Sequence, residues 1–229
     1  MRKSVKVSLT AVFAALHAVL YFISFGLWRN WGIYLESLEG IILGPQAGFT
    51  AALIGSVIAR LVKPDDFWMF GIIAEPVSVL MAGFLARAKW KPALAVFAIM
   101  LAAYFIHPFG RALPLWTILD VLLAAILIYP AAKLGKNLFT TDFKRLPIAL
   151  VLVSFVCIAA DSLVRIFLLV PCGLYSLFFG SFEVLYMVFV EAAVSSYIED
   201  LIVVLVSLIV GAPLLTTMVK LKILNKVEK

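Results

Sequence analysis

Several ionisable side chains stand inside long apolar runs of this sequence. Glu36 and Glu39 open the run YLESLEGIIL, and Glu75 lies within WMFGIIAEPVSVLM. A charged group inside a bilayer costs about 2.5–3.5 kcal/mol on insertion scales, so such residues usually face a cavity or a partner. Glu36 and Glu39 are three residues apart and share one helix face. We expect Glu75 to contact a cationic or hydrogen-bond-donating substrate. Glu36 and Glu39 are expected to bind the substrate or, alternatively, to form a solvated helix start.

Aromatic side chains lie near these acids and at a second turn. Trp31 and Tyr34 precede Glu36, and the turn HPFGRALPLW contains His107 and Trp116. Aromatic residues commonly anchor helices at the membrane interface, but they can also form a wall on which a heteroaromatic ring stacks. We therefore include these four residues among the substrate-binding candidates, beside the alternatives of interface anchors and a surface loop.

Other polar residues within apolar runs have simpler interpretations. Asp161 and Arg165 are four residues apart, a spacing that predicts an internal ion pair with a structural role. Asp120 is a lone acid for which Arg165 or His107 could be the partner. His17 is interpreted as a hydrogen-bonded packing histidine, with a ligand contact as the alternative.

A final acidic row occurs late in the chain. Glu191, Ser195 and Glu199 follow one another at four-residue spacing, which places them on one helix face. This face could line a pocket or meet water. We include Glu191 among the substrate-binding candidates.

Composition decides what kind of protein must position these residues. Of the 229 residues, 65% are hydrophobic and 14% are charged, and the mean hydropathy is +1.13. Soluble domains are about half apolar and about a quarter charged. The apolar runs are continuous, which excludes the alternation of barrel strands. We predict one integral membrane domain over residues 1–229, an all-α polytopic helical bundle. The net charge of +6 is spread over short clusters between apolar runs and is not a nucleic-acid signal.

Six to eight transmembrane segments are expected. The apolar segments are 5–27, 34–44, 47–62, 68–86, 92–109, 114–134, 147–170 and 184–219. The sequence GPQAG separates the second from the third, because proline and glycine both interrupt a helix there. If the chain turns at GPQAG, fourteen basic residues fall on the inner side and four outside. The positive-inside rule favours this topology, which predicts a plasma-membrane protein with cytoplasmic N- and C-termini.

The last apolar segment is too long for one perpendicular crossing. Residues 183–219 as a helix would span about 55 Å, against about 30 Å of hydrocarbon. Glu199 and Asp200 mark a change of environment: we expect residues 201–219 to be the deep part and roughly residues 183–198 to lie toward the outer surface, tilted or bent.

The first apolar segment carries small residues at helical spacing. Ala11 and Ala15 are four residues apart, and so are Ala14 and Ala18. Such pairs let another helix approach closely in lipid. They predict either a partner-docking face or packing within the bundle.

Together these features resemble the substrate-binding S component of energy-coupling factor (ECF) transporters. The resemblance rests on the AxxxA pattern, on GPxxG between two short segments, and on Gly211-Ala212-Pro213-Leu214 near a basic tail. It covers about residues 5–87 and the last segment. Family members usually have six helices, whereas eight segments are counted here, and the pair over residues 92–134 has no counterpart in the resemblance.

The resemblance implies a function and a set of partners. Such a subunit captures a small water-soluble vitamin or related nutrient in an outward-facing pocket. A coupling transmembrane subunit would dock at Ala11, Ala14, Ala15 and Ala18, and two ATPase subunits would supply ATP hydrolysis. The chain itself has no P-loop. It would not be an enzyme, and neither a metal site nor a cofactor is expected.

Three other classes of protein remain as alternatives. A self-sufficient proton- or ion-coupled secondary transporter could use Glu75, Asp161 or Glu191, although a second broken helix pair is not evident. An intramembrane enzyme has little support, since HExxH and GxSxG are absent. A membrane scaffold protein would have neither ligand nor ATPase partner.

Overall fold

The computed structural model describes residues 3–23, 30–64, 67–140 and 144–224, and no strand occurs within them. The elements in chain order are α1 (Lys3–Tyr21), α2 (Ile33–Leu43), α3 (Pro45–Val62), α4 (Trp68–Ala86), α5 (Trp90–Ile106), α6 (Pro108–Ala112), η1 (Leu115–Ile118), α7 (Leu119–Gly135), η2 (Lys136–Phe139), α8 (Arg145–Leu169), α9 (Tyr175–Phe178), α10 (Phe182–Val206), η3 (Ser207–Gly211) and α11 (Ala212–Lys220). This confirms the all-α prediction.

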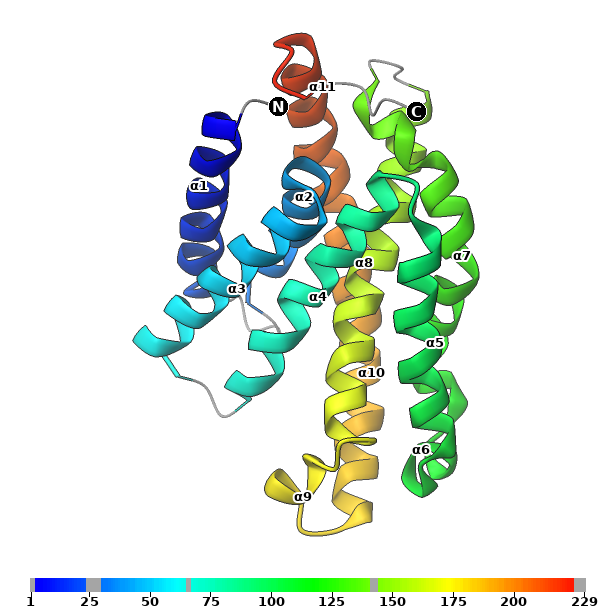
Figure 1. Ribbon diagram of the computed structural model, residues 1–229. Coiled ribbons are helices and arrows are strands. Elements are labelled where there is room, and N and C mark those ends of the chain that lie inside the picture. The colour runs from blue at the N-terminus through cyan, green and yellow to red at the C-terminus, as the bar shows by residue number, and fades with distance from the viewer. Residues whose placement is uncertain (1–2, 24–29, 65–66, 141–143, 225–229) are drawn as a thin grey trace.

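The long helices run up and down through one bundle. α1 begins and α11 ends at the same end, where the turn between α2 and α3 also lies, while α9 and the start of α10 lie at the other end (Figure 1). Within the described residues, six helical stretches are long and apolar enough to cross a membrane, so the chain is a polytopic membrane protein. α5, with 17 residues, is slightly shorter. Which end faces the cytoplasm stays a prediction.

The Gly-Pro break lies where the sequence predicts it. Gly44 has a φ of 89°, a left-handed conformation that favours glycine, and Pro45 begins α3. α2 has only 11 residues, about 16 Å of helix, which is half of the hydrocarbon thickness. Ten of its 11 residues are buried. The segment expected at 34–44 is therefore a half-length helix enclosed by protein rather than a full crossing.

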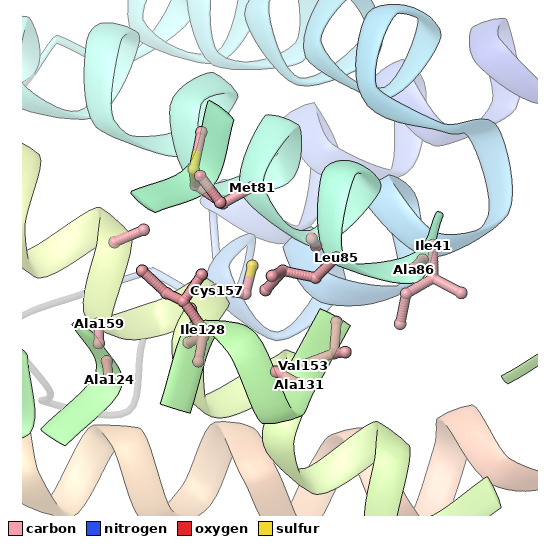
Figure 2. Close-up of a cluster of buried hydrophobic side chains, with 14 of the residues drawn as sticks. Ile41, Met81, Leu85, Ala86, Ala124, Ile128, Ala131, Val153, Cys157 and Ala159 are labelled. Atoms are coloured by element: carbon pink, nitrogen blue, oxygen red, sulfur yellow. The ribbon is translucent and has the colours of Figure 1, made fainter. Parts of the chain in front are cut away.

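Small residues hold the helices close together. A Cβ atom added at Gly40 of α2 would collide with the main-chain carbonyl of Val79 on α4. Figure 2 shows the apolar core, to which α2, α4, α7 and α8 contribute the labelled side chains Ile41, Met81, Leu85, Ala86, Ala124, Ile128, Ala131, Val153, Cys157 and Ala159. Several of these are alanines, which allow the close helix packing typical of membrane bundles.

The final helix carries one irregular turn beyond its centre. The chain is continuously helical from Phe182 to Lys220, and Glu199 and Asp200 are both buried within it. The irregularity lies further on, at the π-helix η3, where Ser207 Oγ is 2.9 Å from Ser37 Oγ of α2. Pro213 lies two residues after the end of this turn and cannot donate to the carbonyl four residues back. The widened π turn accommodates that loss; how deep residues 183–198 and 201–219 lie in the membrane stays a prediction.

Candidate functional site

Glu75 of α4 is the centre of a buried ionic network. Its carboxylate accepts hydrogen bonds from both terminal nitrogens of Arg60 on α3, at 2.5 and 3.0 Å. It also accepts one from Ser56 Oγ and lies 3.0 Å from His17 Nε2 on α1. Glycine makes room for this contact, because a Cβ atom at Gly71 would meet the Arg60 guanidinium.

His17 joins two carboxylates across three helices. Its Nδ1 lies 3.1 Å from Glu39 Oε2 on α2, and its Nε2 faces Glu75. A neutral imidazole has one donor nitrogen, so only the doubly protonated ring can donate to both acids. The interpretation of His17 as a hydrogen-bonded packing residue is confirmed, and its partners are the candidate acids themselves.

Arg165 links this network to α8. Its Nε donates to Asp161 Oδ2 at 2.7 Å and its Nη2 to Asp161 Oδ1 at 3.2 Å, which confirms the predicted ion pair. Its Nη2 also lies 3.6 Å from Glu75 Oε1. The Arg165 side chain is 24% exposed, whereas those of Asp161 and Glu75 are fully buried. Arg165 is therefore the charged group through which the network reaches open space.

Glu36 is held more loosely than Glu75. Its Oε2 accepts a hydrogen bond from Ser78 Oγ on α4. In the described part of the chain, Glu36 Oε1 and Glu39 Oε1 are buried without a hydrogen-bond partner. In the same part of the chain neither carboxylate forms a salt bridge with an arginine or lysine, and the basic side chain that contacts Glu39 is His17.

A cavity of about 220 Å³ lies beside Arg165. It is bounded by the start of α4, by η1 and α7, by the second half of α8, and by α10. Its polar lining residues are Thr117, Asp120, Ser162, Arg165, Ser196 and Glu199. Its apolar lining residues are Phe67, Phe70, Ile166, Leu169, Phe179, Val188, Phe189, Ala192 and Ala193. A mainly apolar hollow with a few polar groups is typical of a small-molecule site. The second half of α8, which lines it, lies toward the end of the bundle opposite the α2–α3 turn (Figure 1).

The predicted acids and aromatics fall into two groups. Glu36, Glu39 and Glu75 come together in the ionic network, but they do not line the cavity. Trp31 and Tyr34 contact each other edge to face at 5.4 Å, and Tyr34 packs with Ile33, Ile158 and Val203. Neither lines the cavity.

The remaining candidates lie elsewhere on the surface. The His107 side chain accepts a hydrogen bond from the Phe109 N–H and thereby caps α6. Trp116 is exposed, and its main-chain carbonyl accepts a hydrogen bond from Tyr197. Glu191 is exposed on α10. These three side chains do not line the cavity, and a role for them in binding remains only a prediction.

The alanines of α1 divide between two faces. Ala14 and Ala18 are buried, and a Cβ atom at Gly55 of α3 would meet the Ala14 carbonyl. Ala11 and Ala15 are exposed. Ala14 and Ala18 thus pack within the chain, and of the four alanines Ala11 and Ala15 are open to a partner.

Of the cavity residues, sequence reasoning placed only Glu199 on a face that could line a pocket, and it did not join this residue with the others into one site. Ser162, Arg165, Ile166 and Leu169 recur at helical spacing along one face of α8. Ala192, Ser196 and Glu199 do the same on α10. This periodicity was available, but nothing local to either segment indicates that the two faces meet.

Comparison with known proteins gives one informative match. The chain is 26% identical over 131 residues to Uncharacterized protein MJ0923 of Methanocaldococcus jannaschii. The alignment covers 56% of this chain and 44% of that protein, so the chain spans less than half the length of that relative. No family model matches the chain. No solved structure matches it significantly.

Proposed function

We propose that this chain is the substrate-binding membrane subunit of an uptake system for a small water-soluble nutrient. The observation that carries the proposal is the 220 Å³ cavity, in which Arg165, Asp120 and Glu199 stand among phenylalanine rings. Polar groups at this depth are costly and mark substrate paths in membrane proteins. The cavity's position far from the α2–α3 turn suits a pocket that opens to the outside.

The resemblance to ECF S components supplies the rest of the proposal. A coupling transmembrane subunit and two ATPases would release the nutrient, a vitamin or related compound, into the cell. Docking would use the exposed Ala11 and Ala15 of α1, while Ala14 and Ala18 support that helix from within. In this arrangement the chain binds and releases its substrate without catalysing a reaction.

A second candidate function is a proton- or ion-coupled secondary transporter. The observation that favours it is the bridge of His17 between Glu39 and Glu75, together with the unpartnered oxygens of Glu36 and Glu39. Chains of acids and histidines carry protons in pumps and transporters. Such a protein would move its substrate without ATPase partners.

Two measurements test these proposals together. Native mass spectrometry of the purified protein, followed by denaturation of the same sample, identifies any small molecule that stays bound. Proteoliposomes containing this protein alone then report uptake of that molecule with and without a proton gradient. We expect a bound small molecule and no gradient-driven accumulation. Accumulation by the protein alone would establish the secondary transporter, and an empty protein that ignores a nutrient panel would favour a scaffold.

A further inference from the structure

Arg165 borders the cavity and keeps hydrogen-bond donors free within the described part of the chain. Its Nε and Nη2 donate to Asp161 at 2.7 and 3.2 Å, and Nη2 also lies 3.6 Å from Glu75 Oε1. Among the described residues Nη1 forms no hydrogen bond. A guanidinium stays charged in proteins, and each of its terminal nitrogens carries two N–H donors. The Arg165 side chain is 24% exposed and lines the cavity, so a ligand there can reach the donors of Nη1.

The hydroxyl groups that line the cavity use their donors within the protein. Thr117 Oγ1 and Ser162 Oγ donate to main-chain carbonyls at 2.6 and 3.3 Å. Ser196 Oγ lies 3.4 Å from Ser162 Oγ, where one hydroxyl donates to the other. A hydroxyl has one O–H donor. The guanidinium of Arg165 is therefore the group best placed to donate to an acceptor on a ligand.

The volume and the walls of the cavity limit the size of that ligand. The cavity measures about 220 Å³, below the roughly 300–1,000 Å³ of drug-sized pockets. An apolar cavity of about 150 Å³ is already large enough to bind benzene. Phe70 and Phe189 line this one and are only 5% and 7% exposed, and aromatic rings pack favourably against another ring. A single ring with one short polar substituent therefore fits the cavity, whereas a fused three-ring system exceeds it.

We propose that the cavity binds a single-ring compound whose carbonyl or carboxylate oxygen accepts hydrogen bonds from Arg165 Nη1, while the ring packs against the phenylalanine side chains. This inference rests on the proposed substrate-binding function and specifies its substrate class. The fork of hydrogen bonds to Asp161 fixes the orientation of the guanidinium. A ligand without an acceptor would take water from Nη1 and leave its donors unsatisfied, which is costly. Arg165 therefore selects for the oxygen.

The test uses the full-length protein in nanodiscs and probes matched on the same ring. Benzene, pyridine, pyrimidine and thiazole rings each carry a carboxamide, a carboxylate, an aminomethyl or a methyl group, and riboflavin serves as a three-ring probe. Binding is screened by thermal shift and measured by calorimetric titration. On at least one ring, the carboxamide or the carboxylate should bind at least about tenfold more tightly than the aminomethyl and methyl compounds, the lower end of what a hydrogen bond to a charged group contributes. The preference between carboxamide and carboxylate identifies the kind of oxygen.

Substitution of Arg165 separates contact with the ligand from a structural role. Arg165→Met should bring the affinities of the oxygen-bearing and methyl compounds of one ring within about twofold of each other, because the donor that distinguishes them is gone. A merely structural role would weaken both compounds equally and leave their ratio unchanged. Arg111→Met is the matched control, since Arg111 is exposed on α6 and does not line the cavity, and it should preserve the ratio. The ratio on the wild-type protein stands as a test even if Arg165→Met fails to fold.

The outcomes separate this inference from the proposed function. Tightest binding of an aminomethyl or methyl compound, or of riboflavin with no single-ring compound, would overturn the inference and leave the substrate-binding function standing. An unchanged ratio in folded Arg165→Met would overturn it as well. If no probe binds but a molecule co-purifies, a single ring with an acceptor oxygen supports the inference and any other structure overturns it. No binder and no co-purified molecule would overturn the proposed function itself.

Discussion

Removing the charge of Glu75 is the sharpest perturbation of the ionic network. Glu75→Gln keeps the size of the side chain but takes the carboxylate from Arg60, whose side chain is only 4% exposed. Arg60 would keep a hydrogen bond of 3.3 Å to the Ser56 carbonyl and no carboxylate partner among the described residues. His17 would keep Glu39. The variant therefore leaves a buried, unpaired guanidinium.

The size of the effect follows from that burial. Breaking a buried ion pair by removing one partner costs about 3–5 kcal/mol. At about 2–4 °C per kcal/mol for a chain of this length, the melting temperature should fall by roughly 6–20 °C. Tryptophan fluorescence of the protein in nanodiscs measures the transition. Glu191→Gln is the matched control, because its side chain is exposed, and surface changes of this kind stay within about 0.5 kcal/mol.

A double-mutant cycle separates the ion pair from general damage. Arg60→Met alone should also destabilise the protein, because it leaves Glu75 without its two guanidinium hydrogen bonds. The Arg60→Met/Glu75→Gln protein should melt closer to wild type than the sum of the two single effects, with a coupling of about 1–3 kcal/mol. Two results would refute the network as a source of stability. One is that the effects of the two single substitutions on the free energy of unfolding simply add in the double variant. The other is a Glu75→Gln protein that melts within about 2 °C of wild type, which corresponds to at most about 1 kcal/mol.

Two further predictions concern packing and topology. Gly40→Ala should lower the melting temperature by an amount equivalent to about 1–3 kcal/mol, because its Cβ would meet the Val79 carbonyl. Gly180→Ala is the control, since nothing lies within 4 Å of an added Cβ there. Equal melting temperatures of the two variants would contradict the close α2–α4 contact. A membrane-impermeant maleimide applied to intact cells should label the exposed Cys172 and not the buried Cys157. Partial burial raises the pKa of the Cys172 thiol, so labelling should be slow at neutral pH and faster at higher pH as the thiolate forms. Labelling of Cys172 only after permeabilisation would place the end of the bundle that carries it in the cytoplasm.

Much of the architecture is already determined by local features of the sequence. The apolar runs predict the spanning helices because hydropathy and length decide membrane insertion segment by segment. Gly44 and Pro45 end one helix and start the next by their own backbone limits. The Asp161–Arg165 pair is predictable for the same reason, since one helical turn separates the two residues.

Other features depend on contacts between distant parts of the chain. The partners of His17 lie 22 and 58 residues away, and the cavity collects side chains from α4, α7, α8 and α10. Glu36, Glu39 and Glu75 were identified as important acids, but only packing reveals that they face one another rather than the cavity. The irregular turn of the last helix at Ser207–Gly211 was not predicted, because its contact with Ser37 of α2 is formed only by packing.

The division has one physical cause. Hydropathy, helix breaks and pairs one turn apart depend on residues close in the chain, so the sequence by itself determined the all-α membrane fold, the Gly-Pro turn and the local ion pair. The direction in which each helix face points depends on how neighbouring helices pack. The tertiary structure alone therefore decided which buried charges meet, and that Asp120, Arg165 and Glu199 share a cavity.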